Sequence, residues 1–273
     1  MRARYIIGRK SRVDPTDRGL AYGDGVFETM SLRGGIVLRL DYHLERLAAG
    51  CERLELPLLD QTELHHQISR ATAGIDRGHL KLILTRGPGP RGYAPPAAPN
   101  PTVILMAESN AGPPASELTL ATLTERLGEN VKLAGIKHLN RLEQVLGRLE
   151  LARIGADEGL MLSTSGNVIG GTSRNLFAVF GNRIKTPALD RAGIAGVMRR
   201  AVLEQCADLE ISAEEADIQP AELHQADELF MTNALVGIQS VIRLDRTAFA
   251  SQQMADQLRH EFAETDGEPT GNA

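Results

Sequence analysis

Lys137 is the side chain of this sequence best placed for covalent chemistry. It follows a short apolar segment, residues 133–136, and precedes a run of apolar side chains at helical spacing. The pattern predicts that Lys137 lies where an apolar loop enters a helix, with its ammonium partly buried. Partial burial disfavours the charged form, and a neutral lysine amine is a nucleophile that can form a Schiff base. The apolar side chains of the run are Leu139, Leu142, Val145, Leu146 and Leu149.

An ordinary lysine at a helix start, with its ammonium in water, is the alternative for Lys137. The composition weakens this alternative, because the chain has only five lysines and uses arginine for its other cations. Arginine does not deprotonate in proteins, so a lysine kept in an arginine-rich chain is a better candidate for chemistry that needs a neutral amine. The five are Lys10, Lys81, Lys132, Lys137 and Lys185.

A second candidate feature is the segment Gly193–Met198, which precedes a predicted helix. Glycines let backbone N–H groups approach a phosphate, and a helix N-terminus favours negative charge. Taken alone, this pattern is weak evidence for a phosphate site, because glycine before a helix is usually just a turn. A Schiff-base lysine and a phosphate cradle together favour pyridoxal phosphate, whereas a lysine-dependent aldolase or a plain binding protein remains open.

Bulk composition excludes several classes of protein. The net charge of −5 and an aromatic content of 4%, with no Trp, argue against a nucleic acid or an anionic membrane as partner. His65 and His66 are adjacent and point in different directions on a helix, so no metal site is predicted. Cys51 and Cys206 are too few for a disulfide framework, which fits a reducing cytosol. We find no signal peptide and no apolar run of membrane length.

Strand and helix patterns alternate along the 273 residues without the regular rhythm of a doubly wound sheet. They predict a fold of the α/β (α+β) class in two domains. The small, Gly- and Pro-rich stretch 109–116 is the predicted linker. It separates an N-terminal domain, residues 1–108, from a C-terminal domain, residues 117–273, which carries Lys137.

Seven stretches, in order along nearly the whole chain, resemble the fold-type IV, or class IV, pyridoxal-phosphate enzymes. The stretches AGIKHLNRLEQVL and RGPGPRGY favour the lyase branch of this family over the branched-chain and D-amino-acid aminotransferases. The seven are GLAYGDGVFET (residues 19–29), HLERL (43–47), TRGPGPRGY (85–93), AGIKHLNRLEQVL (134–146), NLF (175–177), GIAGVMR (193–199) and ADELFMTNAL (226–235).

The resemblance implies a two-domain enzyme with pyridoxal 5'-phosphate in the cleft between the domains. It implies a lyase of folate biosynthesis that converts 4-amino-4-deoxychorismate to 4-aminobenzoate and pyruvate, acting as a cytoplasmic homodimer. Lys137 is then the Schiff-base lysine and the acid/base, and Arg46 contacts the cofactor phosphate. The further implied residues are Val197, Met198 and Ala234 on the cofactor, and Arg91, Tyr93 and Asn233 on the substrate side.

Position 170 departs from the family pattern. The family's glutamate in the strand before Asn-Leu-Phe pairs with the pyridine nitrogen, but here the residue is Gly170, and no carboxylate lies between Asn167 and Asn175. A substitute group, a reaction that needs a weaker electron sink, or lost activity would each explain this. We favour the weaker sink, because releasing pyruvate forms an aromatic ring, and expect Gly170→Glu to raise aminotransferase activity more than lyase activity. An aminotransferase of the same fold and a non-catalytic cofactor-binding protein remain alternatives.

Overall fold

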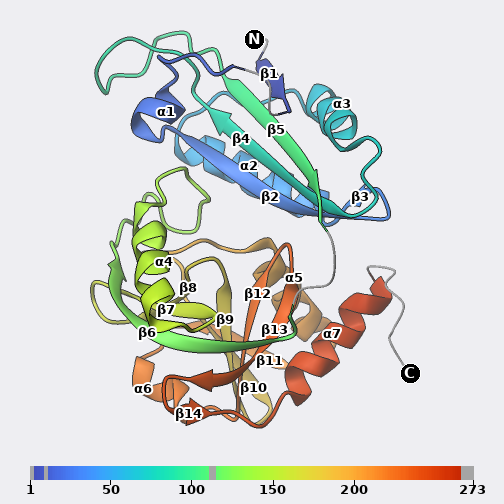
Figure 1. Cartoon of the computed structure of the whole chain (residues 1–273), viewed down its shortest axis with the longest axis vertical. Coiled ribbons are helices and arrows are strands. Elements are labelled where there is room, and N and C mark those ends of the chain that lie inside the picture. The colour runs from blue at the N-terminus through green and yellow to red at the C-terminus, as the bar shows by residue number, and fades with distance from the viewer. Residues whose placement is uncertain (1–2, 9–11, 111–114, 266–273) are drawn as a thin grey trace. The chain divides into compact units, whose positions relative to one another are not determined.

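The computed structural model describes residues 3–8, 12–110 and 115–265. The chain forms two compact units, which are described separately (Figure 1). The first comprises Met1–Gly112 and Ile136–Asn140, and the second comprises Pro113–Gly135 and Arg141–Ala273. The predicted linker lies partly outside the described residues, at 111–114. The units differ from the predicted domains in one segment, because Ile136–Asn140, with Lys137, pairs with a strand of the first unit.

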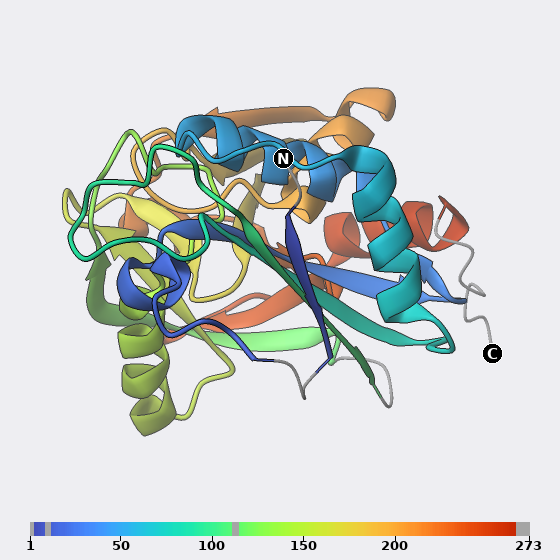
Figure 2. The ribbon, with the colours of Figure 1, turned by 90° about the horizontal axis from the view of Figure 1, so that it is seen from above.

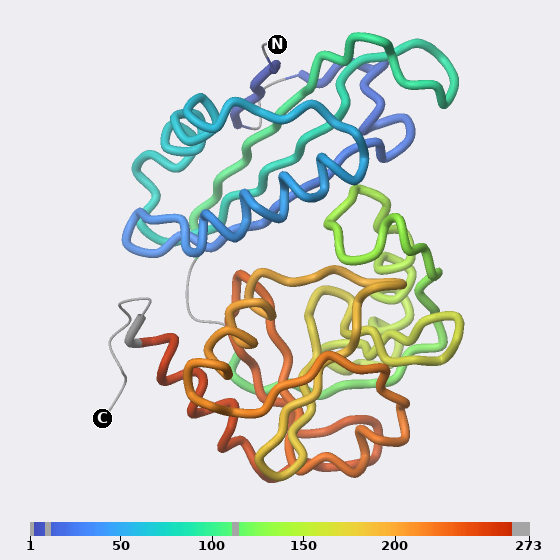
Figure 3. The backbone as a smooth tube through the Cα atoms, turned by 180° about the vertical axis from the view of Figure 1, so that it is seen from behind, coloured from blue at the N-terminus to red at the C-terminus, as the bar shows by residue number. Residues whose placement is uncertain are grey.

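The first unit is built on a five-stranded sheet in the order β1-β5-β4-β2-β3. All neighbouring strands are antiparallel except β1 and β5, and α2 runs along one face of the sheet (Figures 1 and 3). The loop between β4 and β5 extends beyond the end of the sheet (Figure 2). The elements are β1 (Arg4–Ile7), α1 (Arg18–Tyr22), β2 (Gly25–Arg33), β3 (Ile36–Val37), α2 (Leu40–Arg53), α3 (Gln61–Thr72), β4 (Gly78–Thr85) and β5 (Thr102–Ser109).

The two faces of this sheet differ because side chains alternate along each strand. Met30, Leu82 and Leu105 point to the face covered by helices and form a core that is closed to solvent. Phe27 and Lys81 belong to the opposite face, where the side chains are only half-buried.

The second unit is built on a nine-stranded sheet with the path β11-β10-β9-β12-β13-β6-β7-β8, and β14 pairs with β13. Helix α4 packs on β6 and β7, and α5 packs on β12 and β11. Its strands are β6 (Glu117–Leu127), β7 (Glu158–Ser163), β8 (Val168–Gly171), β9 (Asn175–Phe180), β10 (Arg183–Pro187), β11 (Ser212–Ala216), β12 (Glu228–Asn233), β13 (Gly237–Leu244) and β14 (Thr247–Ala248). Its helices are α4 (Leu142–Ile154), α5 (Val197–Asp208), α6 (Pro220–Leu223) and α7 (Gln253–Thr265).

The predicted α/β (α+β) class is confirmed, and one predicted element changes. The helix after Lys137 begins at Leu142 rather than at Leu139, because residues 136–140 are extended and hydrogen-bonded to β2. No helix in the described part of the chain is both long and apolar enough to cross a membrane.

Candidate active site

Lys137 lies in a short extended segment along the edge of β2. Phe27 donates its backbone N–H to the Lys137 carbonyl at 2.9 Å, and Leu139 donates to the Gly25 carbonyl at 3.0 Å. Val26 and His138 form an antiparallel bridge between these two bonds. The two bonds flank His138 and tie the carbonyl of Lys137 to β2, which fixes the backbone that carries the lysine side chain.

The Lys137 side chain is half-buried, and its Nζ lies 4.3 Å from the centre of the Phe27 ring. An aromatic face attracts an ammonium group and also removes water from one side of it. Phe27 points away from the helical core, so Lys137 faces the half-buried side of the sheet.

Directly after Phe27, Glu28 points to the other face and forms a buried cluster with α2. Glu28 is fully buried and accepts hydrogen bonds from Arg46 Nε at 2.8 Å and from Arg46 Nη2 at 2.5 Å. His43 Nδ1 lies 2.6 Å from the second carboxylate oxygen of Glu28. The side chain of Arg46 is only 12% exposed, so Arg46 is not a solvated residue of a polar helix face. Two of its nitrogens are committed to Glu28, which fixes the plane of the guanidinium.

The pKa values of the cluster follow from this packing. Burial by itself would raise the pKa of Glu28, but Arg46 and the hydrogen bonds from His43 and Arg46 outweigh it and hold that pKa below its usual value. Burial lowers the pKa of His43, Glu28 opposes this, and the charges of Arg46 and Lys137 add to the lowering. His43 is therefore neutral at pH 7, and its Nδ1–H donates to Glu28.

In the second unit, the glycine-rich segment before α5 forms the predicted helix start. Gly196 caps α5 without any side-chain cap, so the N–H groups of Val197 and Met198 stand at an uncapped helix N-terminus. A Cβ on Gly196 would overlap the Asn175 side chain, whose Nδ2 donates to the Ile194 carbonyl at 2.9 Å. Glycine is required there because Asn175 approaches the backbone so closely.

A side chain near the end of β12 points to the same face of this sheet as Asn175. Thr232 is the direct cross-strand neighbour of Asn175, so both side chains point to the face that α5 covers. The Thr232 hydroxyl is buried and, among the described residues, has no hydrogen-bond partner. Asn233 uses its side-chain oxygen to accept the N–H groups of Leu235 and Val236, each at 2.9 Å, and so shapes the turn that holds Ala234.

This group of residues in the second unit fits an anionic group such as the phosphate of the expected cofactor. An uncapped helix N-terminus supplies backbone donors and favourable polarity, and an orphaned buried hydroxyl is a feature that calls for a partner. The cofactor residues expected from the sequence thus form two groups, Arg46 and Lys137 in the first unit and Val197, Met198 and Ala234 in the second.

Position 170 is shaped for glycine. Gly170 has a φ of +150°, and a Cβ there would lie 2.8 Å from the carbonyl oxygen of Arg174. Gly171 donates to that same carbonyl at 2.7 Å, which closes a tight turn over residues 170–174. A glutamate in the family position would therefore disturb the turn.

The turn over residues 170–174 surrounds a carboxylate of β7, that of Glu158. Glu158 is fully buried and accepts hydrogen bonds from the Thr172 backbone at 3.1 Å, from the Ser173 hydroxyl at 3.0 Å and from the Arg174 guanidinium. Burial would raise its pKa, but the hydrogen bonds from Thr172 and Gly159 and the Arg174 charge lower it overall. Glu158 is thus ionised and saturated with donors inside the turn.

The expected substrate residues Arg91 and Tyr93 are exposed in the loop between β4 and β5, and Tyr93 is 85% exposed. Arg18 anchors this loop, because its guanidinium donates to the carbonyls of Gly92 at 3.0 Å and Tyr93 at 2.8 Å. Arg18 therefore holds the backbone of this loop, while the side chains of Arg91 and Tyr93 are exposed to solvent.

Four polar residues near the candidate site were missed at the level of sequence: Glu28, Lys81, Glu158 and Thr232. Glu28 left a usable signal, since it is a charge at an inward-facing position of a strand whose other inward residues are apolar. The residues that surround Glu158 and Thr232 lie in other segments of the chain, the turn 172–174 for Glu158 and β9 for Thr232, so no local pattern reveals these settings.

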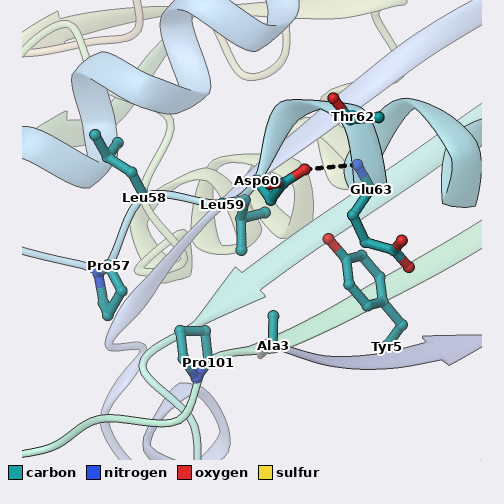
Figure 4. A pocket seen from close by; sticks show the side chains of 9 residues that line it. All are labelled: Ala3, Tyr5, Pro57, Leu58, Leu59, Asp60, Thr62, Glu63 and Pro101. Atoms are coloured by element: carbon teal, nitrogen blue, oxygen red, sulfur yellow. Dashed lines mark hydrogen bonds between the residues drawn. The ribbon is translucent and has the colours of Figure 1, made fainter. Parts of the chain in front are cut away.

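A cavity of about 620 Å³ lies elsewhere in the first unit, between the start of α3 and β1 (Figure 4). Its polar groups are Tyr5, Asp60, Thr62 and Glu63, and Asp60 is engaged in capping α3. It contains none of the predicted site residues. The described residues hold no group of three or more His, Cys, Asp or Glu side chains suited to a metal ion.

Comparison with known proteins adds to this geometry. The model of the family Amino-transferase class IV matches residues 25–244. The chain is 35% identical to the aminodeoxychorismate lyase of Vibrio harveyi over 82% of this chain and 84% of that protein. It is similar in structure to 4-amino-4-deoxychorismate lyase from Pseudomonas aeruginosa, with 39% identity, a TM-score of 0.88 and coverage of 94% and 96%. It is also 28% identical to a putative branched-chain-amino-acid aminotransferase of Methanocaldococcus jannaschii, over 96% and 94% of the two chains.

Proposed function

The chain belongs to the class IV aminotransferase family, and from this premise we propose that it is a pyridoxal-phosphate-dependent lyase. Its reaction converts 4-amino-4-deoxychorismate to 4-aminobenzoate and pyruvate, a step of folate biosynthesis. The observation that carries the proposal is the setting of Lys137: a carbonyl hydrogen-bonded to β2, an amine over Phe27, and the buried Glu28–Arg46 pair on the opposite face of that strand. Relatives named as this lyase, at 35% and 39% identity, support the choice of reaction.

The residues proposed to hold the cofactor are Arg46, Lys137, Val197, Met198 and Ala234. Arg46 would hold the phosphate through its guanidinium, which Glu28 orients. The uncapped N-terminus of α5 would offer backbone N–H groups to a phosphate. The bound cofactor withdraws electrons from the substrate carbon that reacts.

Lys137 is the group that moves the proton. Its amine would hold the cofactor and would take the proton from the ring carbon that bears the substrate nitrogen. Loss of pyruvate then leaves an aromatic ring, which makes the step favourable. On the substrate side, Arg91 pairs with a carboxylate, and Tyr93 and Asn233 line the site.

Gly170 favours the lyase over the second candidate, an aminotransferase. An aminotransferase has no aromatic product to drive its reaction, so it depends more on a carboxylate at the pyridine nitrogen. Some relatives are named as aminotransferases, so this second function is also tested. The test below separates the two.

We also propose a cytoplasmic homodimer. The two cysteines, Cys51 and Cys206, are buried and unpaired, in keeping with a reducing compartment. Support for a dimer comes from α4, whose outer face carries large apolar side chains. Leu142 is 71% exposed and Leu149 is 54% exposed. A helix that is apolar on opposite faces is normally covered on both, so a second copy of the chain is a suitable cover for this outer face.

The deciding experiment is pyruvate release from 4-amino-4-deoxychorismate by the purified protein with pyridoxal phosphate. We expect release by the native chain, a loss on the order of 10²–10⁴-fold in Lys137→Ala, and no loss in the matched control Lys132→Ala, an exposed lysine of the preceding loop. No pyruvate from a native protein that shows the visible absorbance of bound cofactor would reject the lyase. Amino transfer to a keto acid would then establish the aminotransferase, and its absence the non-catalytic alternative.

A further inference from the structure

We propose that Lys81 binds a carboxylate of the substrate and so makes the site selective for carboxylated amines; this rests on the proposed lyase function. Lys81 lies in the middle of β4, directly across from Thr29 of β2. Its neighbours Leu80 and Leu82 point into the helical core, so Lys81 points to the opposite face of the sheet, which is also the face of Phe27.

Lys81 and Lys137 share one aromatic side chain. The Nζ of Lys81 lies 5.5 Å from the centre of the Phe27 ring, and the Nζ of Lys137 lies 4.3 Å from the same centre. Two of the five lysines of the chain therefore converge on Phe27, although they are 56 positions apart in sequence. The backbone pairing of β2 with β4 on one side and with residues 136–140 on the other brings them together.

Lys81 has no ion-pair partner in the described part of the chain. Among the residues that the structure describes, no carboxylate lies within ion-pair distance of its ammonium, and the side chain is half-buried. A half-buried ammonium with no carboxylate of the described chain beside it offers a place for an anionic ligand.

Lys185 in the second unit is a similar lysine over an aromatic ring, but it has carboxylate partners. Its Nζ also lies over an aromatic ring, 5.7 Å from the centre of Phe180, and it is partly buried, with 28% of its side chain exposed. It is, however, neutralised by Glu214 at 3.4 Å and Glu222 at 3.8 Å. The contrast indicates that the counter-charge of Lys81 comes from a ligand.

The chemistry of the proposed reaction specifies that ligand. The substrate amine must reach Lys137, and the ring carries its carboxylate at the end opposite the amine. A flat ring lying near Phe27 would present the amine to one lysine and a carboxylate to the other. The enolpyruvyl side chain carries a second carboxylate, so the common element is a carboxylate on the same molecule as the reacting amine.

The test compares ligands that differ only in this charge. We would measure the affinity of the cofactor-loaded protein for 4-aminobenzoate and for 4-aminobenzamide by calorimetry, and for pyruvate as a second carboxylate. A charge-assisted hydrogen bond is worth about 1.5–3 kcal/mol, which corresponds to roughly 10–100-fold in affinity. The native protein should bind 4-aminobenzoate more tightly than the amide by a margin of this order. If the side-chain carboxylate is the one recognised, it should bind pyruvate measurably instead.

Lys81→Met should abolish that margin, Lys81→Arg should restore most of it, and Lys185→Met is the matched control that should leave it unchanged. A loss confined to 4-aminobenzoate assigns the ring carboxylate, and a loss confined to pyruvate assigns the side-chain carboxylate. In turnover, Lys81→Met should raise KM for the substrate by a similar factor with a smaller change in kcat. Lys81→Gln repeats the measurement if the methionine variant does not fold.

Retention of the margin for both carboxylates in Lys81→Met would overturn the proposal. So would an equal loss in Lys185→Met, or a loss of affinity for pyridoxal phosphate in place of the ligands. The proposed reaction can fail separately, because failure of pyruvate release by the native protein is a different readout from carboxylate selectivity in binding.

Discussion

At the scale of single residues, Gly170 stands where the family resemblance leads us to expect a glutamate. In the structure, the backbone around position 170 is itself shaped for glycine. The backbone has a φ of +150°, the carbonyl of Arg174 fills the space of a Cβ, and Glu158 holds the following turn. The carboxylate of Glu158 is bound by donors on all sides, so it serves the turn. The absence of the family glutamate is thus built into the local structure.

This predicts a cost for any side chain at position 170. Gly170→Ala should lower the free energy of unfolding by about 1–3 kcal/mol, from unfavourable φ and from contact with Arg174. Gly166→Ala is the control, because Gly166 has a φ of +93° but nothing within 4 Å of the place that a Cβ would take, so it reports backbone strain alone. Chemical denaturation measures both, and an equal effect would show that the Arg174 contact costs nothing.

The same cost bears on the expectation for Gly170→Glu. The glutamate must displace the Arg174 carbonyl before it can reach any ligand, so its stability has to be measured with its activities. The ratio of aminotransferase to lyase activity in the folded fraction then tests the weaker-sink hypothesis. An equal change in both activities would contradict that hypothesis.

At the scale of elements, α4 has two apolar faces. Gly147 and Leu151 are buried against the sheet, and a Cβ on Gly147 would lie 3.1 Å from Leu123, so the helix sits flat on β6 and β7. The outer face carries apolar side chains at the spacing of a two-helix seam. These are Leu142, Val145, Leu146 and Leu149, which are 71%, 51%, 40% and 54% exposed.

If this face joins two copies of the chain, one charge on it should separate them. Leu149→Glu should raise the dimer dissociation constant at least ~30-fold, because a buried centre of an interface often contributes 2 kcal/mol or more. Leu58→Glu is the control, since Leu58 is 70% exposed but lies in the first unit. Sedimentation at several concentrations measures the constant, and a dimer that persists in Leu149→Glu would place the interface elsewhere.

At the scale of the whole molecule, the buried Glu28–His43–Arg46 cluster links the stability of the first unit to pH. The pKa values of Glu28 and His43 are both lowered in the folded chain, so the folded state binds fewer protons than the unfolded state. The stability from each group is present above its unfolded pKa and is lost as the pH falls. For His43 the loss begins below about pH 6.5, and for Glu28 below about pH 4.3.

His43→Asn should remove the first part of this decline, because asparagine is uncharged and can still donate to Glu28. The unfolding midpoint of the native protein should fall as the pH drops below about 6.5, and that of His43→Asn should stay flat until Glu28 titrates. Tyrosine fluorescence follows the first unit, since all four tyrosines lie in it and the chain has no Trp. His65→Asn, on an exposed face of α3, is the control that should titrate like the native protein.

The sequence was informative wherever function leaves a local pattern. The α/β (α+β) class, the family and the helix at Val197 were predictable, because glycine spacing and apolar periodicity act within a few residues. The start of α4 was misplaced, because Leu139 fits helical spacing but its N–H bonds to Gly25, 114 residues earlier in the chain. Local periodicity cannot show that a distant strand edge offers better hydrogen bonds.

What the sequence determined by itself is the inventory of the candidate site: one lysine in a distinctive setting, a glycine-rich helix start and a missing glutamate at 170. What only the tertiary structure decided is the surroundings of each group. Strand pairing placed Lys81 beside Lys137 on Phe27, buried Glu28 under Arg46 and closed the turn around Gly170. These contacts join residues far apart in the chain, and burial then sets their charge, so neither is written in any short stretch of sequence.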